Sequence, residues 1–108
     1  MYTMMQVCRE LDMTYQTLKF YCNEGVIPNV KRDHNNRRVF DEKDVKWIKD
    51  LTCLKKCGMS IQEMKKYLEL CLQGEATIVS RKKMLARKQE ELRDSIKELE
   101  DSISYIGW

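Results

Sequence analysis

Residues 14–25 read TYQTLKFYCNEG, and both ends of this stretch carry residues that begin and end helices. Thr14 is a good N-cap, because its hydroxyl can accept a hydrogen bond from a backbone N–H of the first helical turn. Gly25 suits the position after the last helical residue, where the backbone often turns left-handed. The apolar side between these ends is formed by Leu18, Phe20 and Tyr21. The stretch therefore predicts one short helix with clear boundaries.

A shorter helix is predicted just before it, over residues 4–11. Thr3 and Gln6 have the spacing of a capping box, and an apolar face follows them. Asp12 and Met13 leave room only for a tight turn before the next helix. Two short helices joined in this way are typical of a helix-turn-helix.

The segment after the second helix predicts a basic β-hairpin. Pro28 stops the helix, because it restricts the residue before it and has no N–H to donate. Residues 30–32 and 37–39 are short extended runs, and the two asparagines at 35–36 tolerate the backbone of a tight turn. Residues 31–38 carry four basic side chains and one Asp. A basic hairpin directly after a helix-turn-helix is a wing.

Two more helices are expected after the wing. Asp41 is an N-cap candidate for a third helix, which Gly58 closes. Ser60 and Glu63 form a second capping box and open a fourth helix, which Gly74 ends. The side chains expected in the core, with no ligand role, are Leu18, Phe20, Trp47 and Leu51.

Residues 75–106 contain no Gly or Pro and carry a regular apolar repeat. Leu or Ile recurs every seven residues, and from Leu92 onward Ile fills the interleaved position, which gives a heptad seam with Ile at a. About 32 helical residues would span roughly 48 Å, too long to bury a one-sided stripe against the preceding part of the chain. We therefore expect residues 75–108 to pair with a second copy. The seam residues expected at the dimer interface are Leu85, Leu92, Ile96, Leu99, Ile103 and Ile106.

Composition and charge exclude several classes of protein. Charged residues make up 34% and apolar residues 43%, as in globular rather than disordered chains. No run of eighteen apolar residues and no secretion leader is present, so we expect neither a membrane span nor export.

The net charge of +3 comes from residues 1–58, with eleven Lys and Arg against eight Asp and Glu. Such a basic bias beside a helical motif favours a phosphate-backbone partner. No arrangement of His, Cys, Ser or paired carboxylates suggests an enzyme, and no cofactor is expected.

The five cysteines are expected to be free thiols. Their number is odd and none forms a Cys-x-x-Cys pair, which fits a reducing cytoplasm. Cys8 and Cys71 fall on apolar helix faces, whereas Cys53 and Cys57 could face solvent or a partner subunit. Two thiols without further ligands make a poor metal site, and the single histidine, His34, lies in the wing turn. We therefore expect no metal site.

These elements, in this order, resemble the MerR family of bacterial transcription regulators. Residues 14–28 are similar to the family's recognition-helix motif: Ser or Thr, two variable residues, Thr-Leu/Ile-Arg-Tyr/Phe-Tyr-Glu, then Gly-Leu and a Pro. Residues 32–40 resemble its wing, and residues 41–45 and 57–64 resemble the starts of its third and fourth helices. The resemblance covers residues 2–72 motif by motif and the arm by architecture.

Three residues depart from the family pattern. Lys19 stands where Arg is usual and keeps the charge but loses the bidentate fork. Cys22 stands where Glu is usual, and Asn36 where Gly is usual in the wing turn. The resemblance implies a mainly α fold, with a winged helix-turn-helix DNA-binding head of four helices and a small β-hairpin at residues 1–73. A long coiled-coil dimerisation helix would follow at residues 75–108.

The resemblance implies that the second helix enters the DNA major groove. Gln16 could then read an adenine edge, while Tyr15 and Lys19 would hold the DNA backbone and the wing would grip phosphates or the minor groove. Tyr21 could equally belong to the core, and a basic loop taken alone is usually just solvated. The full set of expected DNA contacts is Thr14, Tyr15, Gln16, Lys19, Tyr21, Lys31, Arg32, Arg37 and Arg38.

The family also implies a mechanism. A homodimer binds a pseudo-palindromic promoter site and distorts the double-stranded DNA so that RNA polymerase can use it. Family arms pair antiparallel, although Ile at a with Leu at d is also compatible with parallel pairing.

An effector normally binds beyond the arm, so we expect its site outside this chain, and the terminal Trp108 after Gly107 favours a sensing segment beyond it. The alternatives are an excisionase-like or architectural DNA-bending protein, and a coiled-coil adaptor with an incidental basic head.

Overall fold

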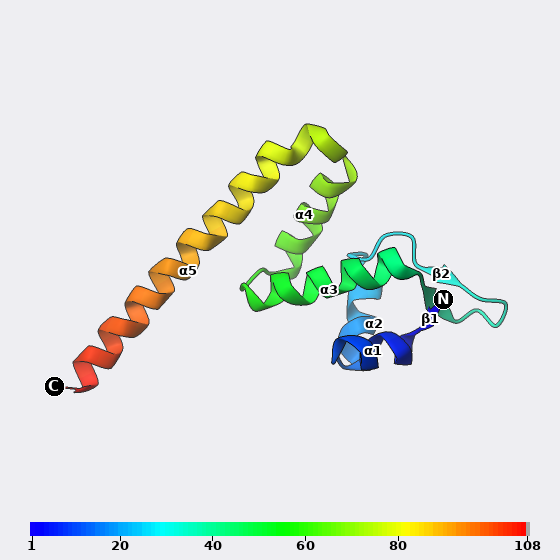
Figure 1. The fold of residues 1–108 in the computed structure, drawn as a ribbon, viewed down its shortest axis with the longest axis horizontal. Helices are drawn as coiled ribbons and strands as arrows, with labels where there is room; N and C mark the ends of the chain where they lie inside the picture. The colour runs from blue at the N-terminus through cyan, green and yellow to red at the C-terminus, as the bar shows by residue number, and fades with distance from the viewer. Residues whose placement is uncertain (108) are drawn as a thin grey trace. The chain divides into compact units, whose positions relative to one another are not determined.

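The computed structural model describes residues 1–107 and divides them into two compact units (Figure 1). The first unit is Met1–Lys56, and the second begins at Cys57. Trp108, on which the expectation of a further segment rests, lies outside the described residues. Of the helices between residues 1 and 107, none combines the length and the apolar content that a membrane-spanning segment needs.

The first unit opens with the predicted helix-turn-helix. Its elements in chain order are β1 (Tyr2–Thr3), α1 (Met4–Leu11), α2 (Tyr15–Glu24), β2 (Lys31–Arg32), β3 (Arg38–Phe40) and α3 (Glu42–Lys56). The Thr3–Gln6 capping box starts α1, and the Thr14 hydroxyl caps α2 by accepting the Thr17 N–H at 3.1 Å. Gly25 ends α2 with φ 74°. Both predicted helices and their caps are confirmed.

A three-stranded antiparallel sheet joins the N-terminus to the wing. β3 is the central strand and pairs with β1 and β2, so that Tyr2 lies opposite Phe40 and Arg32 opposite Arg38. The sequence predicted the hairpin of β2 and β3 but not β1, because two residues are too few to show the alternation that identifies a strand. β1 forms because its backbone hydrogen-bonds to the edge of β3.

The wing turn forms at the predicted asparagines. Asn36 takes a left-handed backbone with φ 61°, and its N–H donates to the Asp33 carbonyl at 2.9 Å. The Asp33 side chain also contributes, since one carboxylate oxygen accepts the N–H of Asn35 at 2.9 Å and of Arg37 at 3.0 Å. The turn is therefore an Asx-type turn that leaves the arginine side chains available for other contacts.

The core of the first unit is formed by α1, α2, α3 and β3. Its fully buried side chains include Val7, Leu18, Val26, Phe40, Ile48 and Leu51. Phe20, predicted to be core, is 46% exposed, whereas its neighbour Tyr21 is 2% exposed. Adjacent helical residues point about 100° apart, so only one of the two can face the core. Trp47, also predicted to be core, is only half-buried, and its Nε1–H donates to the Val26 carbonyl at 2.7 Å.

The second unit is an antiparallel pair of helices. It contains α4 (Ile61–Leu72), a 3-10 turn η1 (Gly74–Thr77) and α5 (Ile78–Gly107), and α4 and α5 contact each other (Figure 1). The Ser60–Glu63 capping box that begins α4 is confirmed. The long helix starts at Ile78 instead of residue 75, because residues 74–77 form the tighter turn. α4, which the sequence grouped with residues 1–73, belongs to this second unit.

The turn between α4 and α5 is held by Thr77 and Arg81. Thr77 is 6% exposed, and its hydroxyl bonds to the carbonyls of Leu70 and Gly74. The Arg81 guanidinium donates to the Thr77 hydroxyl at 3.1 Å and to the Gly74 carbonyl at 3.0 Å. A cation bound at the carbonyl of Gly74, just beyond the last turn of α4, stabilises this helix end.

The heptad seam of α5 is exposed in the single chain. No residue of α5 between Ile78 and Gly107 is buried. Leu85 and Leu92, nearer the start of α5, are 37% and 39% exposed, and the exposed fraction rises to 80% at Ile106. Such a continuous apolar stripe is typical of a helix that pairs with another.

Candidate nucleic-acid interface

The first two turns of α2 present three polar side chains to solvent. Tyr15 is 48% exposed, and Gln16 and Lys19 are also exposed. The Thr14 hydroxyl, in contrast, accepts the Thr17 N–H and donates to the Thr17 hydroxyl at 2.8 Å. The structure therefore gives Thr14 the role of fixing where α2 begins, and leaves the three following side chains able to reach a ligand.

A hollow of about 500 Å³ lies beside the start of α2, inside the first unit. The start of α1, the start of α2 and the wing all contribute to it. Three arginines and no carboxylate line it, so its potential is strongly positive and suits a phosphate backbone. Its lining residues are Thr3, Met4, Met5, Tyr15, Arg32, Asn36, Arg37 and Arg38. Sequence reasoning missed the two methionines, which have no chemical signal for this role.

Two of the three arginines are oriented by hydrogen bonds. Arg32 donates to the Asn36 carbonyl at 2.9 Å across the wing, and Arg38 donates to the Asn23 side-chain oxygen at 2.8 Å on α2. Arg37 makes no ion pair within residues 1–107 and is exposed. The Arg38–Asn23 bond ties the wing to α2, so the two elements present one continuous basic surface.

Lys31 of the wing takes a different position from the other three bases. Its ammonium lies 2.9 Å from Asp41 and 3.3 Å from Asp44 at the start of α3, and it does not line the hollow. The hydrogen bond to Asp41 raises the pKa of Lys31 and, together with the Asp44 N–H, lowers the pKa of Asp41 to about 2. These ion pairs fasten the base of the wing to α3, and the DNA contact of Lys31 stays a prediction.

This ion pair predicts a pH-dependent effect of Asp41→Asn. Asn keeps the oxygen that accepts the Asp44 N–H at 2.8 Å but removes the charge facing Lys31. Because the folded pKa lies below the ordinary value of 3.8, the charge stabilises the fold fully above that pH, and this contribution disappears as the pH falls toward 2. The variant should melt below wild type at pH 7, and the gap should narrow below pH 4. Circular dichroism melts across this range measure it, and a constant gap would contradict the role of the charge.

Tyr21 lies in the core instead of on the outer face of α2. It is 2% exposed, its hydroxyl has no hydrogen-bond partner within residues 1–107, and burial raises its pKa. The neighbouring Cys22 is half-buried, and burial likewise raises the pKa of its thiol against the opposing effect of Arg38 and Arg32. The structure thus favours the core alternative for Tyr21.

All five cysteines are unpaired thiols. Within the part of the chain that the structure describes, no three or more His, Cys, Asp or Glu side chains gather closely enough to hold a metal ion.

Comparisons with known proteins agree with this arrangement. Residues 2–71 match the family model described as MerR HTH family regulatory protein, and residues 45–106 match the model described as MerR, DNA binding. An uncharacterised HTH-type transcriptional regulator of Haemophilus influenzae is 34% identical over 99% of this chain and 79% of its own length. The regulator AdhR of Bacillus subtilis is 37% identical over 81% of this chain and 62% of its own length.

A solved structure extends the likeness to the fold. It is the crystal structure of HiNmlR, a MerR family regulator lacking the sensor domain, bound to promoter DNA. The match has a TM-score of 0.82 and 32% identity, and covers 98% of this chain and 84% of that one. These relatives are regulators, which supports the regulator interpretation over the excisionase-like alternative and implies a role other than catalysis. The chain therefore belongs to the MerR HTH family of regulatory proteins and is a DNA-binding transcriptional regulator of the MerR type.

Proposed function

We propose that the chain acts as a homodimer that recognises a pseudo-palindromic promoter site. In each subunit, α2 enters the major groove and the wing grips the flanking backbone. The two heads together distort the DNA, so that specificity comes partly from deformability, and RNA polymerase then uses the remodelled promoter. This places the protein in the cytoplasm, where the chromosome and the polymerase are.

The observation that carries the proposal is the basic hollow beside the exposed turns of α2. Its lining holds three arginines without a carboxylate, and it adjoins Tyr15 at the start of α2. The positive hollow, which has no acidic side chain in its lining, can bind the DNA phosphate backbone. The exposed start of α2 beside it can contact the edges of the bases. HiNmlR, which lacks a sensor domain, is bound to promoter DNA, and this supports promoter binding by a head and arm of this kind.

Charge along α5 supports an antiparallel pair of arms. Residues 81–88 carry five basic side chains and no acid, whereas residues 90–101 carry six acids and two bases. Paired helices lie about 8–10 Å apart, close to the Debye length at physiological salt, so these charges are only partly screened. Parallel arms would bring like segments together, while antiparallel arms bring the basic segment of one copy to the acidic segment of the other.

Selection of binding sites from random DNA duplexes tests the proposal directly. The purified chain should enrich an inverted repeat, as expected for a symmetric dimer with two recognition helices. Enrichment of a single half-site would contradict dimeric recognition. Binding without enrichment would instead favour an architectural DNA-bending protein, and absence of DNA binding would favour a coiled-coil adaptor.

Gln16→Ala is expected to relax sequence preference more than it weakens binding. If Gln16 makes a bidentate contact to an adenine edge, its loss removes about 1–3 kcal/mol of discrimination at one base position in each half-site. Binding to random DNA should hardly change, because the phosphate contacts remain. Fluorescence anisotropy with the selected site and single-base variants measures this. Gln62→Ala, an exposed glutamine on α4, serves as the matched control, and unchanged discrimination would remove Gln16 from the base contacts.

A further inference from the structure

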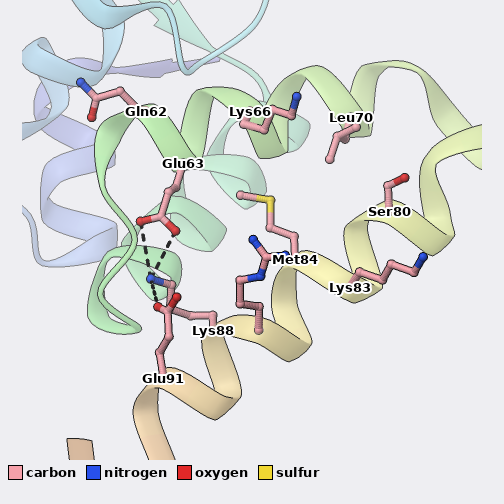
Figure 2. A pocket seen from close by; sticks show the side chains of 10 residues that line it. Gln62, Glu63, Lys66, Leu70, Ser80, Lys83, Met84, Lys88 and Glu91 are labelled. Atoms are coloured by element: carbon pink, nitrogen blue, oxygen red, sulfur yellow. Dashed lines mark hydrogen bonds and ion pairs between the residues drawn. The ribbon is translucent and has the colours of Figure 1, made fainter. Parts of the chain in front are cut away.

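A second groove, of about 590 Å³, lies between α4 and α5 within the second unit (Figure 2). α4 contributes Lys66 and Leu70 to its lining, and α5 contributes Lys83, Met84 and Arg87. In Figure 2 the Met84 side chain points from α5 toward α4, into the space between the two helices. The volume lies within the range of small-molecule sites, roughly 300–1,000 Å³.

The two carboxylates of this groove share one cation. Lys88 lies 3.2 Å from Glu63 on α4 and 2.7 Å from Glu91 on α5, as the dashed lines in Figure 2 mark. The Lys88 side chain is only 13% exposed, so this three-membered cluster forms one end of the groove. The Ser60 N–H, which the Glu63 carboxylate accepts at 3.0 Å, lowers the pKa of Glu63, and the Lys88 ammonium lowers it further. The cluster keeps one negative charge, but the three other cations in the lining outweigh it and leave the groove with a net charge of +2.

The remaining cations have no acidic partner within residues 1–107. Lys66, Lys83 and Arg87 make no ion pair there, and they stand around the half-buried apolar side chains of Leu70 and Met84. Positive charge around a short apolar floor is complementary to a molecule with one anionic end and an apolar body. Two apolar side chains are too few for a bound amphipathic helix, which needs anchors over two or more turns.

The groove faces away from the heptad seam. Met84 and Glu91 each precede a seam residue, Leu85 and Leu92, by one position, and one position turns a side chain about 100° around the helix. A second copy paired along the seam therefore leaves the groove open.

We propose that the α4–α5 groove binds a small amphipathic carboxylate. The carboxylate lies against Arg87 and Lys66, with Lys83 adding positive charge at the rim, and the apolar body rests on Met84 and Leu70. Because α4 and α5 contribute to the site from both sides, the ligand stabilises the packing of this helix pair. The site is distinct from the DNA interface, and its test does not depend on the proposed function.

Isothermal titration calorimetry of the full chain with octanoate tests the proposal. Octanoate should bind saturably with a Kd on the order of 1 mM or below, the range expected for a ligand of its size. Octanamide, which keeps the apolar body but lacks the charge, and acetate, which keeps only the charge, should each bind at least tenfold more weakly. Equal binding of octanoate and octanamide, or no saturable heat, would overturn the proposal.

Paired variants locate the site. Lys66→Ala plus Arg87→Ala should weaken octanoate binding at least tenfold. Lys49→Ala plus Lys97→Ala removes two exposed cations elsewhere and should leave it unchanged. Equal affinity in the two double variants would place the octanoate outside the groove. Sedimentation of the groove variant should match wild type, and a changed oligomeric state would identify the groove as a contact between two copies and overturn the ligand proposal.

Discussion

Leu92→Asp plus Leu99→Asp is expected to convert the dimer to monomers. The two side chains are 39% and 63% exposed in the single chain, so pairing would bury about half of each. Full burial of a leucine is worth about 1.5–3 kcal/mol, so half-burial of four leucines in a dimer contributes about 4 kcal/mol. Losing that contribution alone raises the dimer Kd about 1000-fold, and the buried aspartates add a further penalty.

Sedimentation velocity at micromolar concentration measures this effect. Lys97→Gln plus Ser104→Asp is the matched control, because it also changes the net charge by two units and both residues lie at b positions of the heptad, outside the seam of a and d positions. The control should remain dimeric. If the leucine variant sediments with wild type, the arm is not the dimer interface.

Operator affinity should fall together with dimerisation. A monomer makes the contacts of one half-site only, so it loses the second recognition helix and the second wing. Binding of the leucine variant to an inverted repeat should become equal to its binding to a single half-site. A variant that is monomeric but still prefers the inverted repeat would show that the two heads associate without the arm.

Helix boundaries could be predicted from the sequence because capping is local chemistry. Thr3, Thr14 and Ser60 each accept an N–H three residues further on, and such contacts need no tertiary partner. The wing turn is equally local, since the Asn36 N–H donates to the Asp33 carbonyl and the Asp33 N–H donates to the Arg37 carbonyl.

The features that the sequence did not predict depend on contacts between distant parts of the chain. β1 forms only because β3 lies beside it, and the two strands are separated by more than thirty residues. The ion pair of Lys31 with Asp44 joins residues thirteen positions apart, and the sequence around Lys31 gives no sign of it. Phe20 and Tyr21 are adjacent on α2, and only Tyr21 is buried, which the apolar character of the two side chains could not distinguish.

Arg37→Ala plus Arg38→Ala is expected to weaken DNA binding about 30-fold at moderate salt, because a dimer loses four exposed ion pairs to phosphate, each worth roughly 0.5 kcal/mol. The loss should be the same for specific and random duplexes, because phosphate contacts carry no sequence information. The slope of log affinity against log salt should become shallower by about four, roughly one for each phosphate contact that the dimer loses.

The salt slope separates a DNA contact from a structural role. Arg38 also holds Asn23 on α2, so its loss could weaken binding by loosening the wing. Arg37 makes no such bond, so Arg37→Ala alone should lower the slope by about two, one for each subunit of the dimer, without changing the melting temperature. Lys97→Ala removes one cation from the arm and should leave the slope unchanged. Should Arg38→Ala reduce affinity at an unaltered slope, Arg38 would be a residue that positions the wing, and the phosphate contact would belong to Arg32 and Arg37.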